Sequence, residues 1–101
     1  MYSEERRKIY KKAIETWGFR AQADVLQEEC AELIVAVSHL KRNRPDAIME
    51  VVQELADAYI MVGQITEYLG SDLVEHVVNC KLNNVKERLD KKEMEDGSKG
   101  D

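Results

Sequence analysis

The stretch VLQEECAELIVAVSHL, residues 25–40, decides the fold of this 101-residue chain. Its apolar residues recur at the three- and four-residue spacing of a helix that buries one face in a core. Glu29 interrupts this apolar face, between Ala36 and Leu40 when the helix is viewed down its axis. Because an ionised carboxylate is costly to bury without a partner, Glu29 points to a function as well as to a helix.

Three further stretches show helical periodicity, and none alternates apolar and polar residues as a half-buried strand does. Gly18 and Gly70 are expected to end the first and third helices, and Pro45 to begin the third. Short connections between helices are typical of an antiparallel bundle, so the sequence predicts an all-α four-helix bundle. The helices are predicted over residues 3–17, 22–41, 45–69 and 72–92.

The composition is that of a soluble helical protein, with 44% apolar residues, 35% charged residues and a net charge of −5. We expect one domain over residues 1–92 and a charged, disordered tail over residues 93–101. An acidic chain is poorly suited to bind nucleic acid or anionic lipid by bulk charge. No signal peptide and no run long enough to span a bilayer is visible, which predicts a cytoplasmic protein without membrane or nucleic-acid partners. Cys30 and Cys80 belong to no CxxC pair and are predicted to be free, buried thiols.

The helix predicted over residues 45–69 repeats the pattern of the preceding one. Glu54 lies inside its apolar face and Asp57 follows three residues later, as Glu32 follows Glu29. Residues three apart share one side of a helix, so two facing helices would bring the four carboxylates together. Neither apolar face carries a Lys or Arg to offset the repulsion. Because all the donors are oxygens, the pattern predicts a hard divalent cation, Mg²⁺ first and Mn²⁺ next.

Lys81, Asn84 and Arg88 lie along one edge of the apolar face of the helix predicted over residues 72–92. Beside a carboxylate–metal site, two cations and an amide are suited to hold phosphate oxygens. Long basic side chains at such an edge also commonly extend into solvent, and the sequence leaves both interpretations open.

Two segments of the chain resemble the paired motifs of a known family. EECAE, Glu28–Glu32, and ELAD, Glu54–Asp57, resemble the EExxE and ExxD motifs of the MazG-like all-α nucleoside triphosphate pyrophosphohydrolases. The intervening 21 residues, 33–53, fit the usual spacing of that family. ETWGFRAQADVLQEECAEL, residues 15–33, is also similar to small MazG-like proteins, including phage-encoded ones. The likeness extends over roughly residues 5–90.

The resemblance implies that this chain hydrolyses a (deoxy)nucleoside triphosphate between the α and β phosphates. The products would be a nucleoside monophosphate and pyrophosphate, and the role nucleotide-pool cleansing. It also implies a MazG-like bundle that assembles as a homodimer or homotetramer. Glu28 and Glu29 would act in catalysis, Glu28 by positioning a water or accepting its proton. The Mg²⁺ ligands would be Glu29, Glu32, Glu54 and Asp57.

Contacts to the substrate are less sharply defined by the sequence. Lys81 matches the phosphate-contacting lysine of the family, whereas Asn84 and Arg88 are weaker matches. Trp17 is a candidate to stack on the base, and His39, seven residues after Glu32, is a candidate to flank the base or sugar. Trp17 could equally belong to the core, and His39 to the surface at a helix end.

A non-enzymatic helical dimerisation or adapter module is the main alternative to an enzyme. Such a module would keep or gain stability when Glu29 or Glu54 is replaced by Ala. A di-metal carboxylate oxidase requires Glu-x-x-His on two helices. Neither His39 nor His76 follows a Glu at that spacing, which disfavours this second alternative.

Overall fold

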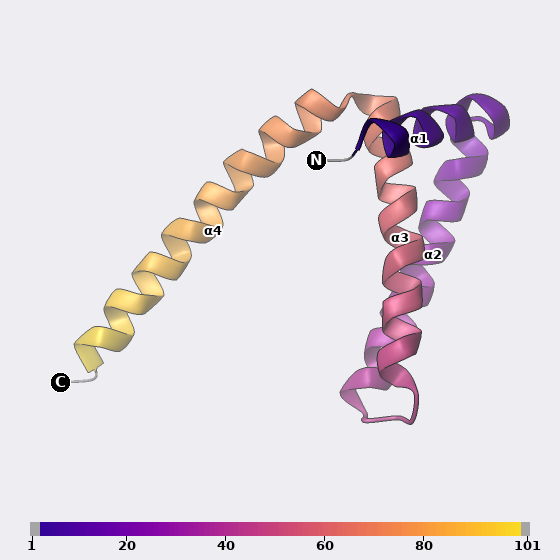
Figure 1. The fold of residues 1–101 in the computed structure, drawn as a ribbon. Coiled ribbons are helices and arrows are strands. Elements are labelled where there is room, and N and C mark those ends of the chain that lie inside the picture. The colour runs from indigo at the N-terminus through magenta and orange to yellow at the C-terminus, as the bar shows by residue number, and fades with distance from the viewer. Residues whose placement is uncertain (1–2, 100–101) are drawn as a thin grey trace. The chain divides into compact units, whose positions relative to one another are not determined.

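The computed structural model describes residues 3–99, with side chains over residues 3–97, and this part of the chain is all-helical. The chain forms two compact units, residues 1–69 and 70–101. The prediction of an all-α chain with four helices is confirmed, whereas a single domain over residues 1–92 stays a prediction. The helices are α1 (Glu4–Trp17), α2 (Phe19–Lys41), α3 (Ala47–Leu69) and α4 (Ser71–Lys99) (Figure 1).

The first two helices are joined by a single residue. Ser3 caps the start of α1, where its hydroxyl accepts a hydrogen bond of 3.2 Å from the Arg6 amide. Gly18 ends α1 as predicted, and its amide donates to the Ile14 carbonyl at 2.8 Å. Gly18 has a φ of +86°, a conformation that glycine adopts without a steric penalty. Because this one residue turns the chain, α2 begins at Phe19, three residues earlier than predicted.

The turn between α2 and α3 ends two residues later than predicted. Pro45 was expected to begin the third helix, but α3 begins at Ala47. Asn43 and Asp46 have φ values of 56° and 62°, in the left-handed region that Asn and Asp enter more readily than most residues. The Asp46 carbonyl accepts the Glu50 amide at 3.1 Å, so helical hydrogen bonding starts after Pro45 rather than at it.

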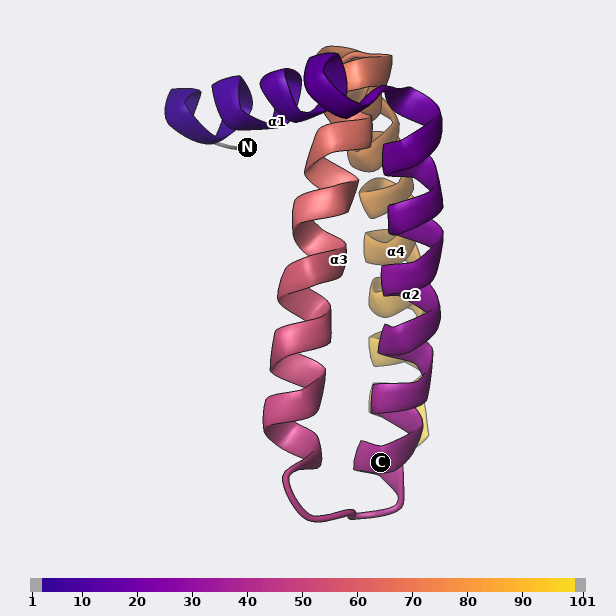
Figure 2. The same cartoon turned by 90° about the vertical axis from the view of Figure 1, so that its right-hand side faces the viewer.

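Helices α2 and α3 lie side by side in opposite directions, and α1 packs mainly against α3 (Figures 1 and 2). The side chains buried between these helices are mostly small, which lets the backbones approach closely. Within the described residues, no helix is both long enough and apolar enough to cross a membrane. The buried apolar residues are Tyr10, Ala13, Ala36, Ala47, Ala58 and Met61.

Helix α1 is attached to α3 by an aromatic ring and by an ion pair. Tyr10 is 4% exposed, and its ring occupies the space beside Gly63. A Cβ at Gly63 would lie 2.8 Å from Tyr10 Cζ, well inside van der Waals contact. One turn further along α3, Glu67 accepts a hydrogen bond of 3.0 Å from Arg7 Nε, and its side chain is 2% exposed. These contacts fix α1 across the end of the α2–α3 pair.

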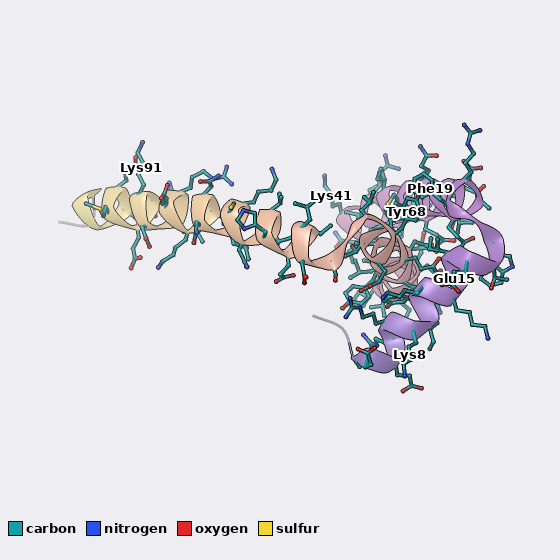
Figure 3. All side chains as sticks on the ribbon, turned by 90° about the horizontal axis from the view of Figure 1, so that it is seen from above. Lys8, Glu15, Phe19, Lys41, Tyr68 and Lys91 are labelled. Carbon is teal, nitrogen blue, oxygen red and sulfur yellow. The ribbon has the colours of Figure 1, made fainter. Side chains whose placement is uncertain are left out.

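The same end of the α2–α3 pair carries two direct side-chain contacts between these helices. Gln22 Nε2 donates to Gln64 Oε1 at 2.7 Å, and both side chains are buried. The rings of Phe19 and Tyr68 stack with centroids 4.4 Å apart (Figure 3). Because the two buried amides hydrogen-bond to each other and the two rings stack, these contacts fix the relative position of α2 and α3 at this end.

Helix α4 is longer than predicted. It begins after Gly70, whose φ of +112° ends α3 as expected, and continues to Lys99. The tail predicted to be disordered from residue 93 is therefore helical up to residue 99, and residues 100–101 lie outside the described part of the chain. Lys92 and Asp96 form an ion pair of 3.5 Å one turn apart, which supports these last turns. Cys80 is exposed and Cys30 half-buried, so the prediction of two buried thiols is wrong for Cys80.

Candidate functional site

The carboxylate residues lie in the middle of the two long antiparallel helices. Glu29 and Glu32 are one turn apart on α2, and Glu54 and Asp57 are one turn apart on α3. Since α2 and α3 pack along their length, the two pairs come to the same level of the helix pair.

Glu29, Glu54 and Asp57 form a group of three carboxylates. One oxygen of each lies within 4.8 Å of one oxygen of each of the other two. Ligand oxygens around an octahedral Mg²⁺ are separated by about 3–4 Å, so small side-chain movements would bring these three onto one ion. The structure thus brings together three of the four residues that were predicted to converge.

Two oxygens of this group are buried without a hydrogen-bond donor. Glu29 Oε2 and Glu54 Oε2 are inaccessible to solvent, and neither has a partner among the described residues. Buried polar atoms in proteins are almost always paired, because leaving one unpaired costs free energy. A cation between the helices would satisfy both atoms, so the residues present fit a metal ion.

The electrostatic surroundings of these two carboxyls are uniformly acidic. The pKa of Glu29 is raised, first by desolvation and then by the charges of Glu32, Asp57 and Glu28, while its contact with Glu54 acts in the lowering direction. The pKa of Glu54 is raised by desolvation, then by a hydrogen bond and a charge from Glu32, then by Glu29 and Asp57. Both side chains are therefore easier to protonate than ordinary glutamates, because burial disfavours the charged form and every neighbouring charge that acts on them is negative.

Glu32 and Glu28 lie outside the three-oxygen group. Glu32 is exposed and touches Glu54, but it does not join the three-oxygen group. Glu32 also lines, with Glu50 and Glu54, a surface hollow of about 310 Å³. Glu28 is exposed and acts on Glu29 through its charge. Its position beside the group is compatible with the predicted proton-accepting role, which stays a prediction.

His39 is paired with Glu50, which was not among the predicted site residues. His39 Nδ1 lies 2.8 Å from Glu50 Oε1 and 3.1 Å from Glu50 Oε2. Glu50 borders the same hollow as Glu32 and Glu54, so His39 is linked to the carboxylate rows through Glu50. The signal for Glu50 was its position one turn before Glu54. A contact between His39 and a base or sugar stays a prediction.

Trp17 lies at the end of α1, and its predicted stacking on a base stays a prediction. It is 64% exposed at the end of α1, so its alternative assignment to the core is wrong. It lines a hollow whose other walls, Ile9, Lys12, Ala13 and Thr16, all belong to α1. None of the site carboxylates borders that hollow.

Another hollow borders two members of the three-carboxylate group. Glu29 and Asp57 line a hollow of about 180 Å³ together with Ile60. Ile60 also lines a larger hollow of about 390 Å³ that is bordered by Arg6 and Tyr59. Tyr59 was not among the predicted site residues, because the position of a residue on one helix does not show where α1 crosses α3.

Lys81, Asn84 and Arg88 belong to α4, in the second compact unit. All three side chains are exposed. Their predicted contact with phosphate oxygens stays a prediction.

Comparison of this chain with protein families, with curated proteins and with solved structures found no match. The resemblance to the MazG-like family therefore rests on the two motifs quoted above and stays a prediction. The fold and the three-carboxylate group stand independently of it.

Proposed function

We propose that this chain hydrolyses nucleoside triphosphates between the α and β phosphates, in a reaction that depends on Mg²⁺. The observation that carries the proposal is the convergence of Glu29, Glu54 and Asp57, with two buried oxygens that lack donors. The reaction class comes from the resemblance of EECAE and ELAD to the paired MazG-like motifs. The acidic group alone would indicate a cation but not a substrate.

The proposed ligands are Glu29, Glu54 and Asp57, with Glu32 at the edge of the group through its contact with Glu54. When bound, Mg²⁺, or Mn²⁺ in its place, would neutralise phosphate charge and lower the pKa of the attacking water. Glu28 is exposed next to Glu29 and is the proposed acceptor of a proton from that water.

The proposed substrate contacts belong to two groups of residues. The hollow bordered by Arg6 and Tyr59 adjoins Glu29 and Asp57 through Ile60, and its apolar wall suits a nucleobase. Lys81, with Asn84 and Arg88, remains the proposed contact to the triphosphate. A homodimer or homotetramer in the cytoplasm belongs to the same proposal.

The reaction is tested with the purified full chain and a panel of ribo- and deoxyribonucleoside triphosphates in Mg²⁺. The products are resolved by anion exchange. A monophosphate with an equal amount of pyrophosphate is the expected result. A diphosphate with orthophosphate, or no turnover of any triphosphate, would contradict the proposal. The Glu54→Gln variant serves as the control for a contaminating hydrolase.

A helical adapter without enzymatic activity is favoured by one observation: many large apolar side chains are exposed, among them Ile34 at 71% and Ile48 at 69%. The two functions differ in their response to metal. An enzyme of the proposed kind gains thermal stability with Mg²⁺, because the ion binds only the folded state, and Glu54→Gln removes that gain. If the chain is an adapter, Mg²⁺ changes the thermal stability of neither the wild type nor the Glu54→Gln variant.

A further inference from the structure

Helix α4 carries a pair of side chains whose chemistry differs from that of the carboxylate site. His76 and Cys80 are one turn apart, and His76 Nε2 lies 3.8 Å from Cys80 Sγ. Both side chains are exposed. Imidazole nitrogen and thiolate sulfur are the donors that Zn²⁺ prefers, whereas Mg²⁺ prefers oxygen.

The spacing of the two donor atoms matches that required by one metal ion. Zn²⁺ binds sulfur at about 2.3 Å and imidazole nitrogen at about 2.0 Å, so the two donors of a tetrahedral ion lie about 3.5 Å apart. The observed 3.8 Å needs only a slight adjustment of the side chains. We propose that His76 and Cys80 form a two-residue binding site for Zn²⁺ or a cation of similar softness, with water at the remaining positions.

The position of the pair on α4 keeps it accessible. At about 100° per residue, His76 and Cys80 fall on the side of the helix opposite its apolar face. A partner that covers the apolar face therefore leaves the pair in water. Asp72, one turn before His76, adds a negative charge on the same side. The apolar face consists of Val74, Val78, Leu82, Val85 and Leu89.

The proposal is independent of the pyrophosphohydrolase assignment, because the pair shares no residue with the carboxylate group on α2 and α3. Failure of the Mg²⁺-dependent reaction would leave it standing. Conversely, loss of the His76–Cys80 site would not touch Glu29, Glu54 or Asp57.

Co²⁺ is the probe for the first experiment, because a cobalt–thiolate bond gives a charge-transfer band in the near ultraviolet. The full chain is titrated with Co²⁺, and Zn²⁺ is then added to displace it. We expect the band in the wild type and in the matched control Cys30→Ser, and no band in Cys80→Ser. His76→Gln should weaken Co²⁺ binding by at least about tenfold, since even loss of a second-sphere partner has an effect of that size. Far-ultraviolet circular dichroism confirms that each variant is folded.

Thiol alkylation supplies a second readout that does not depend on cobalt spectra. In the Cys30→Ser background, Cys80 is the only cysteine left. Zn²⁺ should slow its alkylation by iodoacetamide, and the added His76→Gln substitution should abolish the protection. The proposal is overturned if the wild type shows no cobalt band, if the band follows Cys30, or if Zn²⁺ protects Cys80 equally well without His76.

Discussion

Glu54, on α3, belongs to the three-carboxylate group. It touches Glu32 and is acted on by Glu29 and Asp57, and its Oε2 is buried without a donor. Replacement by an isosteric amide removes the charge while keeping the shape. Replacement of Glu by Gln therefore tests the role of the charge.

Glu54→Gln is expected to reduce triphosphate hydrolysis by at least about 100-fold, because a ligand for the metal is lost. The thermal midpoint without metal should stay the same or rise, since one of several repelling charges disappears. Activity and melting curves with and without Mg²⁺ check both parts. The matched control is Glu15→Gln, the same change at an exposed position of α1, which should alter neither quantity.

The raised pKa values of Glu29 and Glu54 predict a pH dependence of stability. The carboxyl groups of Glu29 and Glu54 bind their protons more tightly in the folded state than in the unfolded state. Their contribution to stability is thus present at low pH, and is lost as the pH rises from the ordinary glutamate range through the raised values. In EDTA, a Glu29→Gln/Glu54→Gln double variant should lose less stability than the wild type over this interval. If the melting temperatures of the two proteins change equally with pH over this interval, the raised pKa values of Glu29 and Glu54 are contradicted.

At the scale of the helices, Gly63 shows how α1 and α3 fit together. Glycine within a helix usually costs about 1 kcal/mol relative to alanine. Here Gly63→Ala should instead destabilise the protein by about 1–3 kcal/mol, because the new Cβ would collide with the Tyr10 ring. Urea unfolding measures the difference. Gly97→Ala on α4 is the matched control, since no atom lies within 4 Å of its Cβ position, and it should be neutral or stabilising.

Helix periodicity and glycine positions predicted most of the elements, and the differences have local causes. Gly18 and Gly70 end their helices at φ values of +86° and +112°, which glycine adopts without a steric penalty. Pro45 did not start α3 because Asp46 takes a left-handed conformation after it. The charged tail was expected to be disordered, but Lys92 and Asp96 are spaced to pair across one helical turn. Such pairings are weak signals in a sequence without apolar periodicity.

The site was predictable where it depends on helix geometry and not where it depends on tertiary arrangement. Glu29, Glu54 and Asp57 were found because two antiparallel helices must bring their interrupted apolar faces together. The position of Glu32 outside the group could not be predicted, because helical periodicity does not give the axial offset between α2 and α3. The pairing of His39 with Glu50 depends on the same offset.

Several large apolar side chains of the first unit are exposed, and we expect them to be buried when copies of the chain associate. Ile34, Ile48 and Leu55 are 71%, 69% and 54% exposed on α2 and α3. Large apolar side chains that are exposed in this way often become buried when protein chains associate. We predict that light scattering finds a dimer or tetramer and that Ile34→Asp shifts it towards monomer. Gln27→Asp, which adds the same charge at an exposed position of α2, should leave the mass unchanged. A wild-type monomer at high concentration would exclude the assembly.

If α2 and α3 hold a divalent cation between their carboxylates, a crystal grown with Mn²⁺ and measured near the manganese absorption edge will reveal it. We predict an anomalous peak in contact with oxygens of Glu29, Glu54 and Asp57. A map in which these side chains are ordered with no peak between them would contradict it.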